Sequence, residues 1–174
     1  MDNQGLTMIF TGNGKGKTTS ALGLAFRALG HDFPVSIIQF IKGSWKYGEL
    51  ESAKRFAGLL DFHVMGKGFT WQSENLQEDI KAAREAWDFA AETILAGKHR
   101  LVILDELTYL IKYDMVPEEK ILAVLQKKPT TMHVVITGRD ASQGLLDFAD
   151  LVTEMREIKH PYKKGIKAQK GIEF

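Results

Sequence analysis

The strongest chemical signal in the sequence is the run TGNGKGKTT at positions 11–19. It follows a short apolar segment, residues 6–10, and precedes a segment with a helical pattern, residues 20–29. Glycines allow successive backbone N–H groups to turn toward phosphate oxygens, and the start of a helix adds partial positive charge. The run therefore predicts a phosphate-binding loop between a strand and a helix, and a glycine-rich turn without a ligand is the weaker alternative.

The side chains of this loop suggest how it would hold a nucleotide. Lys17 would place its ammonium on the outer phosphates, and the Thr18 hydroxyl would bind Mg²⁺. Counting from Gly12, the loop is one residue short of the usual G-x-x-x-x-G-K-T pattern, and Lys15 adds a second cation inside it. The predicted nucleotide ligands in the loop are Gly12, Asn13, Gly14, Lys15, Gly16, Lys17, Thr18 and Thr19.

A second candidate site lies where an apolar segment, residues 101–104, ends in Asp105 and Glu106. In folds with a phosphate loop, such a strand end faces the loop and holds Mg²⁺ directly or through water. Neighbouring residues on a strand point to opposite faces, so the two acids are expected to do different work. We favour Glu106 as the residue nearer the metal, with Asp105 as an alternative or supporting ligand; two merely solvated acids remain the alternative.

Three other segments could indicate which reaction a nucleotide-binding protein of this kind performs. The first, QFIKGSW at 39–45, is followed by Gly48 and Glu49 and lies at a predicted strand exit. The second, MGKGFTW at 65–71, places two large aromatics in a glycine-rich stretch, which suggests an apolar plate for a flat ligand. From the residues alone, core packing or a partner interface explains these aromatics better.

The third segment is the C-terminal tail, residues 156–174. From Arg156 to Lys170 it carries six Lys or Arg residues and one acid. A lid over anionic phosphates and a solvated tail are equally compatible with this composition.

The elements that must position these residues alternate along the chain. Apolar, partly β-branched segments predict strands at 6–10, 35–40, 62–65, 101–104, 133–137 and 151–155. A second helix is predicted from an apolar face at helical spacing, and Pro117 followed by two glutamates predicts the start of a third. The face of the second helix is formed by Leu76, Ile80, Ala83, Trp87, Ala90 and Ile94. This alternation predicts a single α/β domain, residues 1–174, with a mostly parallel sheet flanked by helices, in the RecA-like class with a phosphate loop.

Composition narrows the function classes. The chain has 174 residues, 23 Lys and Arg, 22 Asp and Glu, and no Cys, which excludes disulfides, thiolate nucleophiles and Cys-based metal sites. A net charge of +1 gives no global basic field for nucleic acid. No segment reads as a membrane span or a signal peptide, so we expect a cytoplasmic protein.

The combination of segments resembles the ATP:corrinoid adenosyltransferases of the CobA/BtuR/CobO type. The matching blocks are GNGKGKTT, QFIKGSW with GE, MGKGFTW, LVILDELTY, VVITGR, ADLVTEM and KHPYKKGIKAQKGIE. They run from about residue 8 to 174 in the family's order, and the short loop is itself a feature of the family.

The resemblance implies a reaction that phosphate loops do not usually serve. In the family, the Co(I) of a reduced corrinoid attacks the 5′-carbon of ATP and inorganic triphosphate leaves, giving adenosylcobalamin or an adenosylcobinamide-type precursor. It implies that Phe69 and Trp71 lie under the corrin and exclude a lower metal ligand, which eases reduction of Co(II). It makes Lys42 and Arg139 further candidate contacts to ATP, although a structural ion pair explains Arg139 equally well.

Partners are also implied by the resemblance: ATP, Mg²⁺, the corrinoid, a reduced flavoprotein as electron donor, and a second copy of the chain in a homodimer. Many members begin with a charged helical segment that can cover the site. Few residues precede the first predicted strand here, so either that cover is absent or the tail supplies it. The competing functions are a small-molecule kinase or ATPase with a phosphate loop, which would yield ADP, and a corrinoid carrier gated by nucleotide.

Overall fold

The computed structural model describes residues 4–41, 48–66 and 76–173 of the chain. Within them, six strands form one sheet in the order β3-β2-β4-β5-β1-β6, and every neighbouring pair is parallel. The strands are β1 (Thr7–Thr11), β2 (Val35–Gln39), β3 (Leu60–Val64), β4 (Leu101–Asp105), β5 (His133–Thr137) and β6 (Leu151–Glu154). The predicted α/β architecture is confirmed, and both ends of each predicted strand lie within two residues of the ends observed.

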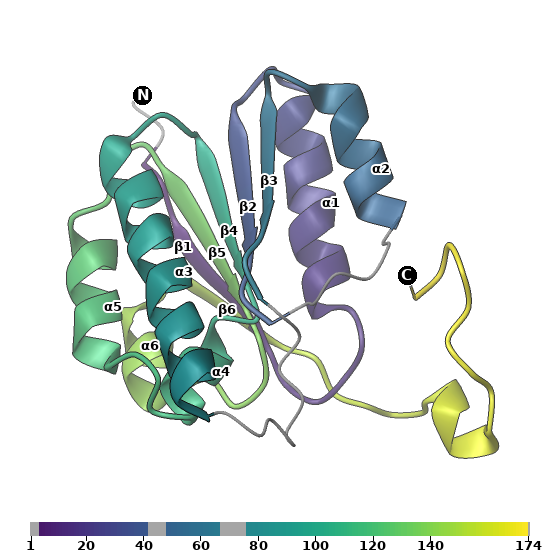
Figure 1. Ribbon diagram of the computed structural model, residues 1–174. Helices are drawn as coiled ribbons and strands as arrows, with labels where there is room; N and C mark the ends of the chain where they lie inside the picture. Colours follow the sequence, from purple (N-terminus) through teal and green to yellow (C-terminus); the bar gives the residue numbers. More distant parts are fainter. Residues whose placement is uncertain (1–3, 42–47, 67–75, 174) are drawn as a thin grey trace.

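Helices cover both faces of this sheet (Figure 1). On one side lie α1 (Lys17–Leu29) and α2 (Gly48–Ala53), and on the other α3 (Leu76–Ala96), α4 (Thr108–Lys112), α5 (Glu118–Gln126) and α6 (Gln143–Phe148). Two short 3-10 turns, η1 (Lys54–Phe56) and η2 (Pro161–Lys164), complete the described elements. None of the helices in these ranges is both long and apolar enough to cross a membrane.

Alternation along the strands divides the core into two layers. Ile9, Leu104 and Ile136 belong to the layer under α3 to α6, whereas Phe10 and Ile103 belong to the layer under α1. All five side chains are at most 9% exposed. The central strands are therefore buried on both faces, which explains why their sequences are nearly continuous in apolar residues.

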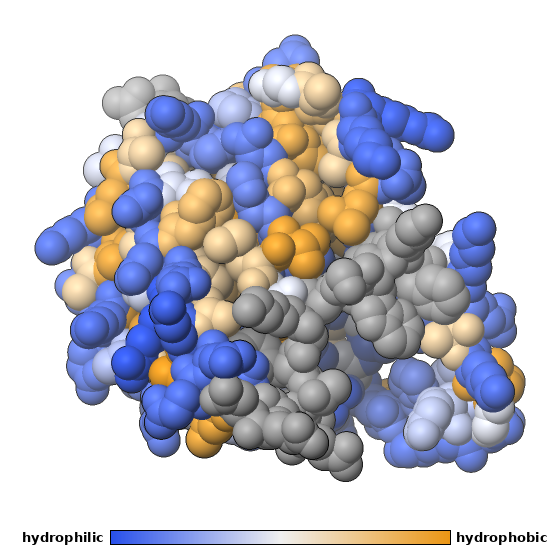
Figure 2. Space-filling model, viewed as in Figure 1, coloured by the Kyte–Doolittle hydropathy of each residue, from blue (hydrophilic) through white to orange (hydrophobic). Residues whose placement is uncertain are grey.

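The two edge strands are less well covered. No residue of β3 is fully buried, and Figure 2 shows hydrophobic residues at the surface in the region between α2 and α3. All four residues of β6 are exposed, including Leu151 at 40% and Val152 at 43%.

The helix boundaries refine the predictions. α1 begins at Lys17 rather than residue 20, because Gly16, with φ 123°, turns the chain directly from the loop into the helix. The helix start predicted at Pro117 is confirmed, because α5 begins directly after this residue, whose own backbone is extended. Leu76, predicted on the buried face of α3, is 61% exposed, because packing of this helix on the core begins at Ile80.

The parallel arrangement brings several polar strand ends to one edge of the sheet. The carboxyl end of β1 leads into the glycine loop, that of β4 carries Asp105, and that of β5 carries Thr137. Since β5 pairs with both β4 and β1, Thr137 lies between the loop and the acidic pair.

The double-sided core predicts a large cost for truncation in a central strand. Ile136→Ala should lower the free energy of unfolding by about 2–5 kcal/mol, because its side chain is fully buried. Val152→Ala, on the exposed edge strand, should change it by less than about 1 kcal/mol. Urea unfolding followed by circular dichroism measures both, and similar losses for the two variants would contradict the assignment of core and edge.

Candidate nucleotide-binding site

The glycines of the loop permit close packing against the chain that follows β6. Gly12 has φ 93°, and the Gly14 N–H donates to the Met155 carbonyl at 2.7 Å. A Cβ at Gly14 would lie 2.8 Å from the carbonyl oxygen of Arg156, and one at Gly12 would lie 2.5 Å from that of Met155. Glycine is therefore required at positions 12 and 14, because the backbone of residues 155–156 lies too close for a side chain. This constraint was not predicted from the sequence.

Lys17 occupies the inside of this loop. Its side chain is largely buried, and Nζ donates to the carbonyl oxygens of Gly12 at 2.7 Å and Gly14 at 2.9 Å. Burial lowers the pKa of Lys17, the nearby carboxylate of Glu106 acts in the opposite direction, and the guanidinium of Arg139 adds to the lowering. An anion bound beside this ammonium would favour its charged form.

Asp105 is the centre of a buried hydrogen-bond network. Its side chain is 1% exposed and accepts three bonds from three other elements. Oδ1 accepts from Thr18 Oγ1 at 2.8 Å and from Thr137 Oγ1 at 2.7 Å, while Oδ2 accepts from Gln39 Nε2 at 2.9 Å. The carboxylate therefore ties the start of α1 to the ends of β2, β4 and β5.

Glu106 is placed differently from its neighbour. It lines the cavity beside the loop, whereas Asp105 does not. Its φ of 65° is in the left-handed region, which is unfavourable for a residue other than glycine, and its N–H donates to Thr137 Oγ1 at 2.9 Å. The two adjacent acids therefore occupy different environments, as expected, but the cause is the left-handed turn at Glu106 after the end of β4 and not alternation along the strand.

The cavity has a volume of about 630 Å³ and opens between the loop, α2 and the end of the tail. Its lining includes two lysines, two neighbouring threonines and three glutamates, one of which belongs to the C-terminal tail. The lining residues are Lys15, Gly16, Lys17, Thr18, Thr19, Leu22, Gly48, Glu49, Ser52, Glu106, Gly171, Ile172 and Glu173.

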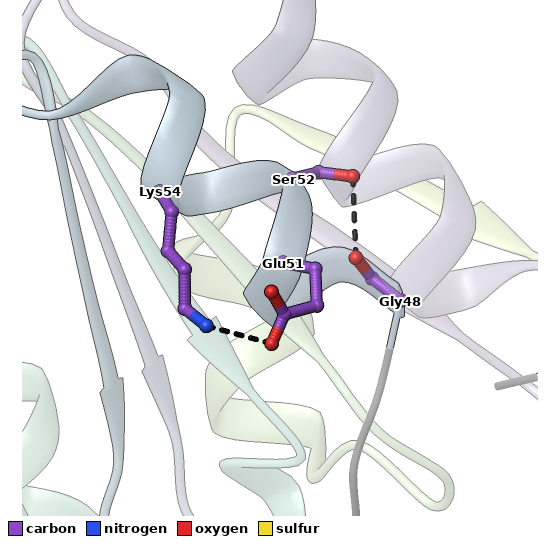
Figure 3. A network of polar contacts seen from close by, with 4 residues as sticks. All are labelled: Gly48, Glu51, Ser52 and Lys54. Carbon is purple, nitrogen blue, oxygen red and sulfur yellow. Dashed lines mark hydrogen bonds and ion pairs between the residues drawn. The ribbon is translucent and has the colours of Figure 1, made fainter.

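One wall of the cavity is formed by α2, shown in Figure 3. Ser52 Oγ donates to the carbonyl oxygen of Gly48 at 3.2 Å, which closes the first turn of this short helix. Glu51 forms an exposed ion pair with Lys54 at 2.7 Å and does not line the cavity. The acid that α2 contributes to the wall is instead Glu49.

The opposite wall is the tail. Lys15 Nζ lies 3.3 Å from Glu173 Oε2, with both side chains partly exposed. The C-terminal segment thus returns to the loop after the exposed turn η2, as the chain trace in Figure 1 shows. A carboxylate of the protein itself is therefore the partner of one of the two lysines that line this cavity.

The predicted site residues are only partly brought together. The structure gathers Gly16, Lys15, Lys17, Thr18, Thr19 and Glu106 around one cavity. Asn13 lines a separate hollow of about 380 Å³, formed with residues 154–157 and Lys163. Arg139 is exposed and near enough to influence Lys17. Three predicted residues, Lys42, Phe69 and Trp71, lie outside the described residues.

Two residues of the network were given no role of their own by sequence reasoning, although Gln39 begins the QFIKGSW segment. Gln39 and Thr137 are fully buried and end β2 and β5. The available signal was a polar residue closing an apolar strand at the edge where the loop lies, the same signal that identified Asp105.

The donor set suits a small, hard cation. Thr18 and Glu106, two residues with oxygen-bearing side chains, both line the cavity, and Mg²⁺ is commonly held by one or two protein oxygens together with substrate phosphates. Within the described ranges, no cluster of three or more His, Asp or Glu residues forms a metal cage of its own. The residues present therefore fit a metal that arrives with a phosphorylated ligand.

The parallel sheet, the glycine loop after β1 and the buried acid that ends β4 define a nucleotide-binding protein of the RecA-like class with a phosphate loop. The flagellar accessory protein FlaH of Methanocaldococcus jannaschii shares this fold, with a TM-score of 0.61 at 14% identity, covering 87% of this chain and 71% of that one.

Sequence comparison then identifies the family. The model of the ATP:corrinoid adenosyltransferases BtuR/CobO/CobP matches residues 3–174, and the chain belongs to this family. It is 46% identical to the corrinoid adenosyltransferase of Pseudomonas aeruginosa, covering 99% of this chain and 85% of that protein. Identity to the corrinoid adenosyltransferase of Escherichia coli is 43%, over 99% of this chain and 87% of the other.

The different environments of the two acids predict different phenotypes. Asp105→Asn should lower the free energy of unfolding by about 1–3 kcal/mol, because an amide places a donor against groups that already donate. Glu106→Gln should cost less stability and should weaken the binding of ATP mainly when Mg²⁺ is present. Thermal melts and calorimetric titration with and without EDTA separate the two effects, and equal losses of stability would contradict this division.

Proposed function

We propose that this protein transfers the 5′-deoxyadenosyl group of ATP to the Co(I) centre of a reduced corrinoid. Cobalt supplies the electron pair for the new Co–C bond, the bond between C5′ and oxygen breaks, and triphosphate leaves with that bonding pair. The family match carries the proposal, and the cavity with Lys15, Lys17 and Thr18 is the supporting geometry. The nucleophile is the metal, so the protein needs no side chain to act as a general base.

The loop would serve the leaving group. Negative charge grows on the triphosphate as the bond to C5′ breaks, and fixed cations at that place stabilise the transition state. Lys17, inside the loop, and Lys15, at its rim, supply such charge. Bound Mg²⁺ would be held by Thr18 and Glu106 and would neutralise further charge, with Asp105 as the support for Thr18.

The corrinoid side of the reaction is assigned to Phe69 and Trp71. By resemblance to the family, these aromatics would cover the lower face of the corrin and exclude a fifth ligand, which makes Co(II) easier to reduce. Lys42 and Arg139 are assigned to the nucleotide or its triphosphate, and the exposed position of Arg139 near Lys17 is compatible with this.

The tail, residues 156–174, would act as the lid of the cavity. Its residues Gly171, Ile172 and Glu173 form one wall, and Glu173 already contacts Lys15. A homodimer, a reduced flavoprotein as electron donor and a cytoplasmic location complete the proposal. The exposed edge strand β6 is a candidate surface for the second copy, because unpaired strand edges readily add further strands.

The central test is the identity of the phosphate product. Protein, Mg·ATP and cobalamin held as Co(I) by a strong reductant, kept dark and anaerobic, should give a light-sensitive adenosylcobalamin with stoichiometric triphosphate. Lys17→Ala should slow this transfer roughly a hundredfold, because a fixed cation at the leaving group is lost.

Lys128 provides the matched control. Its ammonium also donates to two backbone carbonyls, Gly5 at 2.8 Å and Met132 at 2.9 Å, at the opposite edge of the sheet. Lys128→Ala should reduce stability and leave the rate of transfer unchanged. Formation of ADP and phosphate regardless of corrinoid would instead establish a kinase or hydrolase and overturn the proposal.

The aromatic pair gives a second test. The double variant Phe69→Ala, Trp71→Ala should bind ATP like the wild type but should adenosylate poorly when the reaction starts from Co(II). The two starting states are compared by the visible spectrum of the product. If chemically prepared Co(I) is used just as poorly, the aromatics have no role in tuning the reduction.

A further inference from the structure

Thr137 lies between the phosphate loop and the acidic pair, and its contacts have no role in the loop itself. It is the last residue of β5, it is fully buried, and β5 lies between β1, which leads into the loop, and β4, which ends in Asp105. Its hydroxyl touches both members of the acidic pair.

The direction of each bond at this hydroxyl follows from its partners. A carboxylate only accepts and a backbone N–H only donates, so Thr137 Oγ1 gives its proton to Asp105 Oδ1 at 2.7 Å and accepts from the N–H of Glu106 at 2.9 Å. One side chain therefore links the carboxylate of Asp105 to the backbone of Glu106. Valine, its closest isostere, makes neither bond.

The link to Asp105 also orients Thr18. The same oxygen, Oδ1, accepts the Thr18 hydroxyl proton at 2.8 Å. Because the Thr18 hydroxyl donates its hydrogen bond to Asp105, the lone pairs of its oxygen can bind a cation in the cavity that Thr18 lines. Thr137 and Gln39 hold that carboxylate in place from two other strands.

The link to Glu106 acts through the backbone. Glu106 has φ 65°, a conformation that costs free energy for a residue with a Cβ and persists only where its surroundings hold it. The bond from its N–H to Thr137 fixes the peptide plane that precedes this unusual dihedral angle. Glu106, held in that backbone conformation, lines the cavity.

From this geometry we propose that Thr137 is a positioning residue for the metal site: its hydroxyl sets the orientation of Thr18 through Asp105 and of Glu106 through its N–H. The inference rests on the proposed Mg·ATP chemistry but concerns binding of the metal with the nucleotide, not transfer to cobalt. The competing explanation is a threonine that merely satisfies buried polar groups.

The test compares Thr137→Val with Thr137→Ser. Calorimetric titration with ATP, once with Mg²⁺ and once with EDTA, is the readout, and neither titration contains a corrinoid. Thr137→Val should weaken Mg²⁺-dependent ATP binding about 10- to 100-fold, the usual effect of removing a group that orients a metal ligand, and should leave binding in EDTA within about twofold. Thr137→Ser, which keeps the hydroxyl, should restore most of the affinity.

Thr108→Val is the matched control. Thr108 is also a buried threonine, 1% exposed, and among the described residues its Oγ1 has no hydrogen-bond partner. Its replacement should affect neither titration. Should Thr137→Val fail to fold, Thr137→Ala provides a second variant without the hydroxyl.

The outcomes are decisive in both directions. A selective loss with Mg²⁺ that serine restores supports the inference. An equal loss with and without the metal, a loss that serine does not restore, or no loss at all overturns it. A wild-type protein that binds Mg·ATP yet transfers nothing to Co(I) would overturn the proposed function and leave this inference standing.

Discussion

The buried carboxylate of Asp105 is the constraint around which the site is organised. A charge at 1% exposure is tolerated only when hydrogen bonds replace the water it has lost. Here the donors come from Gln39, Thr18 and Thr137, so three separate elements must converge on one point. The parallel sheet makes this possible, because the carboxyl ends of β2, β4 and β5 meet at one edge. Satisfying one charge therefore fixes the beginning of α1, and with it the loop that precedes the helix.

At the same edge of the sheet, one acid supports the structure and its neighbour is available to the ligand. Asp105 lies out of contact with the cavity, while Glu106, one residue later, lines it through a backbone turn that few residues adopt. A nucleotide hydrolase must direct an attacking water at the terminal phosphorus, whereas the proposed transfer requires only that the phosphate chain be held and its charge balanced. A loop with two lysines around one cavity, and no required base, agrees with that simpler demand.

Much of this arrangement could be predicted from the sequence because it depends on local signals. Glycine spacing, Lys17-Thr18 and the strand–loop–helix context identified the loop. Different environments for Asp105 and Glu106 were expected from alternation along a strand, but the structure separates them by ending β4 at Asp105 and turning the backbone at Glu106. What could not be predicted depends on contacts distant in sequence. The packing of Gly14 against residues 155–156 requires the pairing of β1 with β6, and the bonds of Thr137 require the register of β4 against β5. Leu76 was misplaced because helical spacing does not show where along a helix the core begins.

The contacts of Lys17 make ligand binding an exchange. The Lys17 ammonium already donates to the carbonyl oxygens of Gly12 and Gly14. A phosphate oxygen that accepts a hydrogen bond from this ammonium therefore displaces a backbone carbonyl of the same loop. The enthalpy gained is then a difference between two sets of bonds, not the sum of new ones. The released carbonyls must find other donors or turn toward water, which couples occupancy of the site to the shape of residues 12–16. Phosphate chains of different length would therefore be discriminated by how many of the lost hydrogen bonds within the loop each one replaces.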